Sequence, residues 1–273
     1  MEIRKVGVVG CGIMGSGIAQ VCAQSGYQVV VSEINDELLN KGLASINSFL
    51  TKGVEKGKVS QADKDATLSR IKGITNMKDF SDCDLMIEAV TENLDLKKKV
   101  FAELDKICPK HAILATNTSC LSVIDMAAET SKPEKVLGMH FFNPVQIMRL
   151  LELVKTVATS DETLETIKDF SQSLGKTIVI SKDSPGFLTS RLGTVQRLEA
   201  IRMLEAGVGT AEDIDTAIKL GYNHPMGPFE LYDFVGLDTG LFIANAMYEV
   251  TKDPKFAPPT LLQKMVAAGW LGR

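Results

Sequence analysis

The chain has 273 residues, of which 45% are hydrophobic and 23% are charged, and its formal net charge is −4. These values are ordinary for a soluble globular protein and leave room for two domains. A negative net charge gives no indication of a basic surface that would bind nucleic acid or an anionic membrane. No apolar run approaches membrane-spanning length. A strand-like run begins almost at the N-terminus, so we expect no signal or transit peptide. Five scattered cysteines without a Cys-x-x-Cys pair favour reduced thiols, and hence the cytoplasm, over disulfides or a metal site.

The first 26 residues have the pattern of a dinucleotide-binding turn. An apolar run at 6–9 predicts a buried parallel strand, and residues 16–25 predict a helix. Between them lies a Gly-x-Gly-x-x-Gly motif. Its first glycine permits a tight turn, its second lets the backbone approach a pyrophosphate, and its third allows the helix to pack closely on the strand. The predicted cofactor-binding residues of this turn are Gly10, Gly12, Ile13, Met14 and Gly15.

A second apolar run at 27–31 ends close to Glu33, which comes 18 positions after the last glycine of the motif. A carboxylate at this place accepts hydrogen bonds from the adenosine ribose and repels a 2′-phosphate, so the sequence favours NAD over NADP. The alternative is a glycine-rich turn in an α/β protein that binds no nucleotide.

Residues 36–71 have a helical pattern that is broken near Gly53 and Gly57, where Lys52 and Lys56 lie. Lysines on an exposed turn usually form only a solvated surface. They also suit a polyanionic substrate, and the pattern does not distinguish these two interpretations.

Two further predicted strands end in polar residues. The apolar run at 84–90 is followed by Glu92, Asn93 and Lys97. Residues just beyond such a strand face the ligand crevice of an open α/β sheet, so these three are candidates for contact with the ribose on the nicotinamide side. The strand predicted at 112–115 leads into polar residues that form either a hydrogen-bonding rim or a helix N-cap.

One of the three histidines, His140, lies at the end of an apolar run and is followed by two phenylalanines. An imidazole at the end of a buried strand is well placed for proton transfer near neutral pH. A lone histidine beside apolar residues is more often a packing residue, so the motif by itself leaves both interpretations open.

A β-branched run at 177–180 precedes a Ser-Pro-Gly segment, which predicts a boundary between a domain at 1–183 and a domain at 184–273. The second domain has only helical patterns, at 187–206, 211–220, 230–250 and 260–268. We therefore expect an α/β fold with a Rossmann-type doubly wound sheet, followed by an all-helical C-terminal domain.

Several motifs together resemble the L-3-hydroxyacyl-CoA dehydrogenase family, and the short chain is most similar in form to its 3-hydroxybutyryl-CoA dehydrogenases. The resemblance covers essentially the whole chain without long insertions. It rests on Asn117-Thr118-Ser119, Met139-His140-Phe141-Phe142-Asn143-Pro144, Met148-Arg149-Leu150-Leu151-Glu152-Leu153, Ser184-Pro185-Gly186-Phe187, Glu212-Asp213-Ile214-Asp215, His224-Pro225-Met226-Gly227-Pro228-Phe229-Glu230-Leu231 and Gly236-Leu237-Asp238.

The resemblance implies a catalytic set. His140 matches the family's general base, which takes the proton of the 3-hydroxyl as hydride leaves C3 for the nicotinamide. Glu152 matches the carboxylate that orients this histidine and stabilises its protonated form. Ser119 matches a serine that hydrogen-bonds the substrate near the reacting oxygen and touches the cofactor.

The resemblance also implies binding residues. Asn143 matches an asparagine that contacts the cofactor, and Glu92 and Lys97 match residues that line the nicotinamide half of the site. Lys52 and Lys56 are the nearest matches to the lysines that meet the CoA phosphates in the family.

Two features depart from the family pattern. The family often has an Asn-Arg pair after its Pro-Gly-Phe segment, whereas this chain has Ser190 before Arg191. Ser190 keeps one donor and one acceptor but loses the reach of the amide, so its catalytic role is the open point of the resemblance. Relatives also continue into a tail that can contribute a cofactor contact, whereas this sequence ends at Arg273.

The implied activity is NAD-dependent interconversion of (S)-3-hydroxyacyl-CoA and 3-oxoacyl-CoA, by a homodimer joined through the helical domain and without metal, nucleic acid or membrane. An intramolecular helical bundle is the alternative to the dimer. One alternative activity is dehydrogenation of a free hydroxy acid, which faster turnover of 3-hydroxybutyrate than of its CoA thioester would reveal. The other alternative is a non-catalytic NAD-binding protein, against which the presence of Ser119, His140 and Glu152 argues.

Overall fold

The computed structural model describes residues 2–272, and the chain divides into two compact units. Unit 1 consists of Met1–Thr118 and Ser122–Asp183, and unit 2 consists of Ser119–Leu121 and Ser184–Arg273. The expected tail contact beyond Arg273 lies outside the described residues. Within residues 2–272, no helix combines the length and the apolar composition that crossing a membrane requires.

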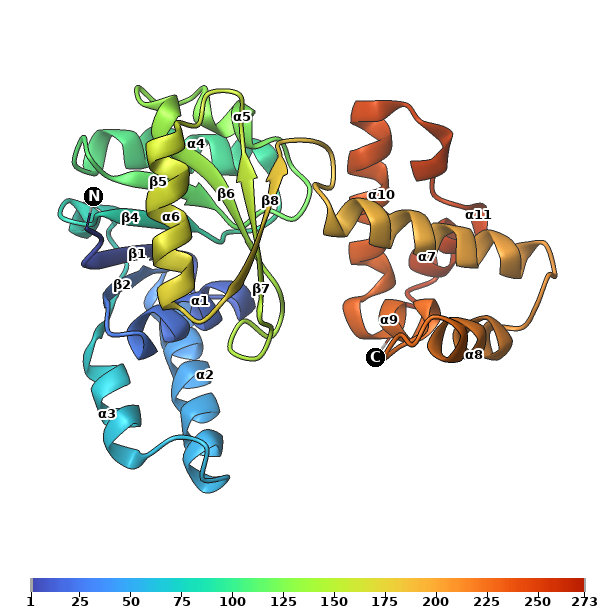
Figure 1. Ribbon diagram of the computed structural model, residues 1–273, viewed down its shortest axis with the longest axis horizontal. Coiled ribbons are helices and arrows are strands. Elements are labelled where there is room, and N and C mark those ends of the chain that lie inside the picture. Colours follow the sequence, from blue (N-terminus) through green and yellow to red (C-terminus); the bar gives the residue numbers. More distant parts are fainter. Residues whose placement is uncertain (1, 273) are drawn as a thin grey trace. The chain divides into compact units, whose positions relative to one another are not determined.

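Unit 1 is built on one eight-stranded sheet with the order β3-β2-β1-β4-β5-β6-β7-β8 (Figure 1). Its strands are β1 (Lys5–Val9), β2 (Gln28–Ser32), β3 (Ile71–Ile74), β4 (Leu85–Glu88), β5 (Ile113–Thr116), β6 (Val136–Phe141), β7 (Leu150–Lys155) and β8 (Thr177–Lys182). All neighbours are parallel except β6 and β7, so β7 and β8 run opposite to the other six strands. The reversal of strand order between β1 and β4 is typical of a Rossmann-type sheet and confirms the predicted fold class.

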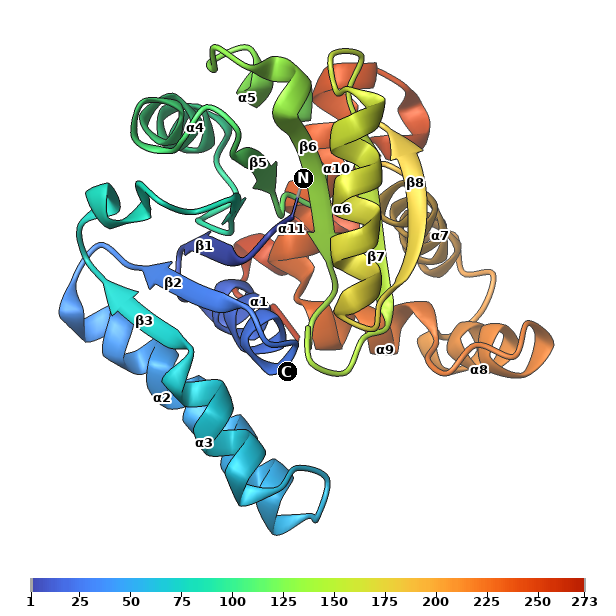
Figure 2. The same ribbon diagram turned by 60° about the vertical axis from the view of Figure 1, so that its left-hand side comes forward.

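Helices cover both faces of this sheet. They are α1 (Ile13–Gln24), α2 (Asp36–Glu55), α3 (Gln61–Ser69), α4 (Leu94–Ile107), α5 (Val123–Ala127) and α6 (Asp161–Ser173), with short 3-10 turns η1 (Met77–Phe80) and η2 (Pro133–Lys135). Buried residues of α1, α2 and α6 share one core with alternate strand residues. Figure 2 shows α4 and α5 on the other side of the sheet from α6. Because both faces are covered, the central strands are continuous apolar runs.

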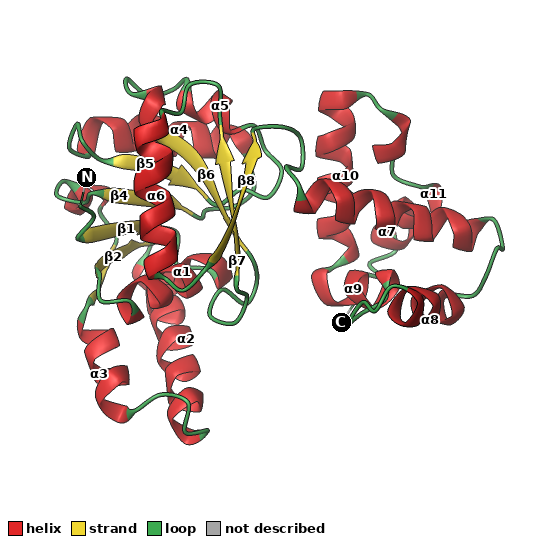
Figure 3. Cartoon of the chain, viewed as in Figure 1, coloured by secondary structure: helices red, strands yellow, loops and turns green. Residues whose placement is uncertain are grey.

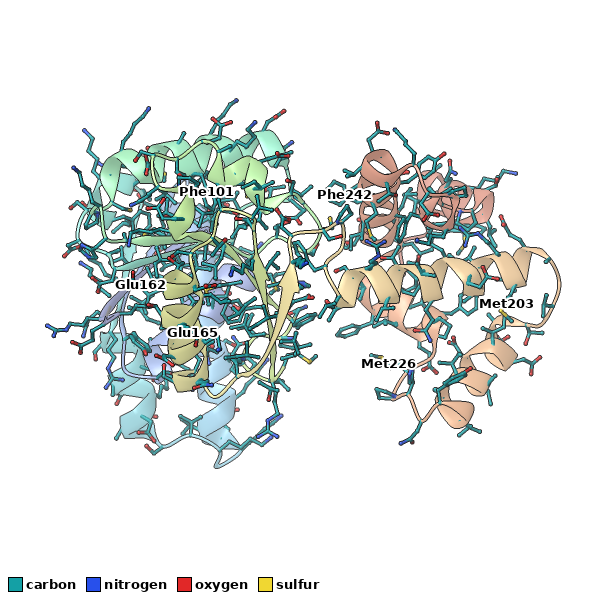
Figure 4. The ribbon with its side chains drawn as sticks, turned by 45° about the horizontal axis from the view of Figure 1, so that its top comes forward. Phe101, Glu162, Glu165, Met203, Met226 and Phe242 are labelled. Carbon is teal, nitrogen blue, oxygen red and sulfur yellow. The ribbon has the colours of Figure 1, made fainter. Side chains whose placement is uncertain are left out.

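Helices α4 and α6 are amphipathic, with mostly apolar side chains on the buried face and charged side chains on the exposed face. Figure 4 labels Phe101 of α4, which is fully buried, and Glu162 and Glu165 of α6, which are exposed. On α6 the buried face carries Ile167 and Phe170, one helical turn apart. Each such side chain contributes about 1.5–3 kcal/mol when it is fully removed from water.

Unit 2 contains only helices among its described residues, whereas every strand belongs to unit 1 (Figure 3). The helices are α7 (Thr189–Glu205), α8 (Ala211–Gly221), α9 (Pro228–Val235), α10 (Leu237–Thr251) and α11 (Thr260–Ala267), with the 3-10 turn η3 (Pro254–Phe256). Leu198, Tyr232, Leu237 and Leu262 bring α7, α9, α10 and α11 together in one core. The predicted all-helical region is confirmed.

Two details of the sequence prediction were wrong. The single helix expected at 230–250 is two helices, because Gly236 adopts φ 99° between α9 and α10 and so interrupts the helical backbone. The helical pattern expected up to residue 71 ends earlier, and Ile71–Ile74 forms strand β3 at the edge of the sheet. This short segment gains its strand conformation from pairing with β2 rather than from its own pattern.

Candidate active site

The glycine motif forms a tight cradle between β1 and α1. Gly10 has φ 95°, and a Cβ on Gly15 would lie 1.9 Å from the carbonyl oxygen of Gly10. Side chains are therefore excluded at both places. A Cβ on Gly12 would meet no atom within 4 Å, so the backbone there is open to approach. Gly12 is the N-cap of α1, whose first N–H groups lack intrahelical partners, and this combination fits a dinucleotide pyrophosphate.

The other predicted residues of the cradle, Ile13 and Met14, form the first turn of α1. Ile13 is 78% exposed, whereas Met14 packs partly against the core of unit 1. Their backbone N–H groups belong to the helix terminus, which is the part of the cradle that suits an anion.

Glu33 lies beside this cradle, at the end of β2. Its Oε1 accepts a hydrogen bond of 2.8 Å from the backbone N–H of Cys11, and its Oε2 accepts one of 3.0 Å from the N–H of Ile34. The carboxylate is thereby fixed while each oxygen retains a lone pair for a ribose hydroxyl. Burial, with a smaller contribution from the charge of Glu33, raises the pKa of the Cys11 thiol to about 12, so that thiol stays neutral.

His140 and Glu152 lie opposite one another on the antiparallel strands β6 and β7. The ring nitrogen Nδ1 of His140 is 3.0 Å from Oε2 of Glu152, and the two residues are 6% and 0% exposed. A buried carboxylate is unfavourable without such a partner. When Nδ1 carries the proton that Glu152 accepts, the basic lone pair of the ring is on Nε2. The ring of Phe142 packs beside the imidazole, with the ring centroids 4.4 Å apart.

The loop after β6 is anchored on the elements around the cradle. Asn143 is exposed at its start. The ammonium of Lys176 donates to the carbonyl oxygens of Val145 and Met148, at 2.5 and 2.8 Å, and burial lowers the pKa of this lysine. The Gln146 amide donates to the fully buried Gln20 side chain of α1 at 3.0 Å. The Gln146 contact ties the loop that carries Asn143 to α1, the helix of the cradle, and the Lys176 contacts tie it to the segment before β8.

Five residues at the ends of β4 and β5 and on α4 form what we call the Glu88 cluster: Glu88, Glu92, Lys97, Thr116 and Thr118. Glu88 is 0% exposed and Lys97 is 1% exposed, and their charged groups are 2.7 Å apart. The Lys97 ammonium is also 3.2 Å from Glu92, so the structure brings these two predicted residues together. Lys97 is buried between two carboxylates rather than exposed in the crevice.

Sequence reasoning assigned no role to Glu88, Thr116 or Thr118 individually. The available indication was the carboxylate itself, because an acid inside an apolar strand has to be paired. Asn93, which had been considered for the cofactor site, caps α4 by accepting from the N–H of Leu96 at 2.9 Å. Its side chain therefore has a structural role.

The remaining predicted residues lie elsewhere. Lys52 lies in the last turn of α2 and Lys56 is its C-cap; both are exposed, and neither forms an ion pair with any residue in the range 2–272. Ser119 and Ser190 belong to unit 2, whereas His140 and Glu152 belong to unit 1. Cys120, next to Ser119, is buried against Ile243, Met247 and Phe256 and serves packing.

Comparisons with known proteins agree with this geometry. The family described as "3-hydroxyacyl-CoA dehydrogenase, NAD binding domain" matches residues 5–184, and "3-hydroxyacyl-CoA dehydrogenase, C-terminal domain" matches residues 186–273. A 3-hydroxybutyryl-CoA dehydrogenase of Bradyrhizobium diazoefficiens is 45% identical over 99% of this chain and 92% of its own.

Solved structures are similar over the same extent. The (S)-3-hydroxybutyryl-CoA dehydrogenase of Ralstonia eutropha has a TM-score of 0.96 at 45% identity, covering 100% of this chain and 96% of its own. A diketoreductase that acts on dicarbonyl compounds has a TM-score of 0.87 at 29% identity, again covering 100% of this chain and 96% of its own. With an NAD-binding cradle, a buried histidine–glutamate pair and family matches along both units, this chain belongs to the 3-hydroxyacyl-CoA dehydrogenase family.

Proposed function

We propose that this chain is an NAD-dependent oxidoreductase that interconverts (S)-3-hydroxyacyl-CoA, with 3-hydroxybutyryl-CoA as the expected substrate, and 3-oxoacyl-CoA. The observation that carries the proposal is the buried hydrogen bond between His140 and Glu152, in the same unit as the glycine cradle. The glycine cradle and Glu33 would hold NAD, which would supply the hydride acceptor for C3 of the hydroxyacyl group and, in its reduced form, the hydride donor for the reverse direction.

The proton step falls to His140. As C3 is oxidised, the substrate O–H bond breaks, its electron pair forms the new C=O bond, and Nε2 takes the proton. Glu152 holds the imidazole in the required tautomer and stabilises the imidazolium by charge. The burial of both side chains strengthens this electrostatic interaction relative to water. In our assignment Ser119 and Ser190 hydrogen-bond the substrate around the reacting oxygen.

Cofactor and CoA are assigned to different parts of unit 1. We place the pyrophosphate at Gly12, the adenosine ribose at Glu33, and the nicotinamide half near Asn143 and the Glu88 cluster. The exposed ammonium groups of Lys52 and Lys56 are assigned to the CoA phosphates, because they have no competing ion pairs in the described part of the chain.

An initial-rate comparison tests the activity. We expect NADH formation from (S)-3-hydroxybutyryl-CoA and NAD, a much lower rate with NADP, and little turnover of free 3-hydroxybutyrate at the same concentration. Faster turnover of the free acid would overturn the thioester assignment in favour of the alternative substrate class. Initial rates with thioesters of increasing acyl chain length measure the chain-length preference, since one methylene in an apolar pocket changes the binding free energy by about 1–3 kcal/mol.

We also propose that unit 2 joins two copies of the chain. Large apolar side chains remain exposed on its helices and turns, whereas a monomer rarely exposes a large contiguous apolar surface. They include Leu192, Val208, Leu220, Tyr222, Phe234, Phe242, Val250 and Trp270. Light scattering at micromolar concentration is expected to give twice the chain mass of 29.6 kDa. A mass of one chain at that concentration would contradict the dimer.

We assign the protein to the cytoplasm. All five cysteines are free thiols and buried, which is the state that a reducing compartment maintains. Localisation of a tagged full chain by fractionation tests this assignment.

A further inference from the structure

Helices α7 and α9 of unit 2 bring together an arginine and a tyrosine that the proposed chemistry does not use. The guanidinium carbon of Arg197 lies 5.3 Å from the ring centroid of Tyr232. The ring packs directly on the backbone of α10, where a Cβ on Gly240 would lie 2.2 Å from its Cε1. Tyr232 is 2% exposed, whereas Arg197 is partly exposed. The guanidinium is therefore accessible from solvent, and the ring behind it is fixed.

The hydrogen-bond donors of this pair lack acceptors in the described part of the chain. Nε of Arg197 and the hydroxyl oxygen of Tyr232 are buried, and neither atom has a hydrogen-bond partner within residues 2–272. Burial raises the pKa of Tyr232, against the opposing effect of the Arg197 guanidinium, so the hydroxyl keeps its proton and remains a donor. Arg202 on the same helix is paired with Glu199 and donates to three backbone carbonyl oxygens. Arg197 thus differs from its neighbour in having no acceptor for a buried donor, which is unfavourable.

A third polar atom without a partner lies one turn before Arg197 on α7. Thr194 is 1% exposed, and its hydroxyl has no hydrogen-bond partner among the described residues. A helical threonine can donate to the carbonyl four residues before it, and Thr51, Thr67 and Thr251 do so here at 2.7–2.8 Å. The exception at Thr194 leaves three unpaired polar groups together on α7 and α9. Such a group indicates a site for a polar ligand or for ordered water.

The position of the guanidinium on α7 relates it to Ser190. Ser190, Gly193 and Arg197 follow one another at spacings of three and four residues, so they share one face of the helix. The three atoms nearest to a Cβ on Gly193 all belong to the Arg197 guanidinium, at 3.2–3.8 Å. The guanidinium therefore lies back over Gly193, about 4.5 Å along the helix axis from Ser190. Because Gly193 has no side chain, the face of α7 is bare between the two.

We propose that Arg197 and Tyr232 bind a carboxylate at the far end of the acyl chain, so that the enzyme also oxidises (S)-3-hydroxyacyl-CoA thioesters whose acyl chain ends in a carboxylate at C6. The inference rests on the proposed function, which assigns Ser190 to the oxygen on C3. Three carbon–carbon bonds separate C3 from C6 and span about 4 Å, which matches the separation of Ser190 and the guanidinium along α7. The hydride and proton transfers at C3 stay as proposed above.

The donor set suits a carboxylate rather than a neutral chain end. A guanidinium presents planar N–H groups that match the two oxygens of a carboxylate, and the phenol hydroxyl adds a further donor. A methyl group at the same place would leave these donors unpaired, whereas a carboxylate would satisfy them. Arg197 is therefore assigned as a residue that determines substrate specificity, without a part in the reaction at C3.

The test compares two thioesters of equal length, (S)-3-hydroxyhexanedioyl-CoA with a free terminal carboxylate and (S)-3-hydroxyhexanoyl-CoA with a terminal methyl group. We call kcat/KM for the first divided by kcat/KM for the second the acid ratio. Arg197→Met retains an apolar stem against Tyr232 but loses the charge and the donors. Its acid ratio is expected to fall about 30-fold below wild type, while kcat/KM for the hexanoyl thioester stays within about twofold.

Lys264→Met is the matched control, because it removes the same charge from an exposed position on α11. Its acid ratio is expected to stay within about twofold of wild type, and a fall as large as that in Arg197→Met would overturn the local site. An unchanged acid ratio in Arg197→Met is the result expected if ordered water alone occupies the site, and it overturns the proposal. The same unchanged ratio with a lower mass by light scattering would assign Arg197 to a carboxylate of a second copy, which also overturns it.

Tyr232→Phe covers the case in which Arg197→Met does not fold, as judged by circular dichroism. It removes one donor and retains the ring that packs on Gly240, so the acid ratio is expected to fall about fivefold; an unchanged ratio overturns the proposal. Wild type that oxidises 3-hydroxybutyryl-CoA but not the hexanedioyl thioester overturns this inference alone. Wild type that oxidises none of the three thioesters overturns the proposed function as well.

Discussion

His140→Gln is expected to lower kcat for oxidation of (S)-3-hydroxybutyryl-CoA about 1000-fold, while the dissociation constant for NADH stays within about twofold of wild type. Glutamine preserves much of the size and polarity of the side chain but cannot take a proton from the substrate hydroxyl. The cradle and Glu33 belong to the β1–α1–β2 segment, whereas His140 lies on β6, so cofactor binding is expected to be retained. Steady-state kinetics and NADH fluorescence measure the two quantities.

A second histidine of unit 1 supplies the control for this variant. His111 is more than half exposed and is paired with Asp84, away from the residues assigned to the reaction. We expect His111→Gln to retain wild-type kcat. Normal turnover in His140→Gln would remove His140 from the role of general base.

Gly15→Ala is expected to have the second largest effect, through the backbone rather than through chemistry. The added Cβ would lie 1.9 Å from the carbonyl oxygen of Gly10 and 2.8 Å from its carbon, and a carbonyl of the tight turn cannot rotate away as a side chain can. We expect the free energy of unfolding to fall by about 3 kcal/mol, together with loss of NAD binding. Urea denaturation and calorimetry measure the two effects.

Gly12→Ala provides a matched comparison within the same motif. Its Cβ would meet no atom within 4 Å, and the backbone of Gly12, at φ −69°, suits any residue. This variant is therefore expected to keep wild-type stability and still lose NAD affinity, because the Cβ occupies the approach of the pyrophosphate. Wild-type stability in Gly15→Ala would contradict the steric explanation.

The parts of the fold that could be predicted from the sequence are those determined locally. An apolar run such as Val29–Val31 indicates a buried strand, and the glycines around α1 indicate a tight turn. Each of these patterns depends only on the residues of its own segment. Strand β3 could not be predicted, because Ile71–Ile74 contains a lysine and a glycine and becomes a strand only by pairing with β2. The division of the helix at Gly236 was equally unpredictable, since an isolated glycine is tolerated within many helices.

The candidate site shows the same limit. The family resemblance implied that His140 and Glu152 form a pair, and the register of the β6–β7 hairpin sets them opposite one another. Apolar alternation alone does not specify such a register, because the turn between the strands also determines it. The Glu88 cluster was not predicted because its hydrogen bonds join residues as far apart in the chain as Glu88 and Thr116.

The central claim, that His140 and Glu152 act as one proton-transfer unit, is tested most directly by a double-mutant cycle of kcat. Glu152→Gln is expected to lower kcat about 100-fold, because the imidazole loses the carboxylate that orients it and stabilises its charge. Once His140 is absent, Glu152 has no imidazole to support. The prediction is that His140→Gln/Glu152→Gln is no more than about threefold slower than His140→Gln alone. Losses that multiply to about 100,000-fold would contradict it.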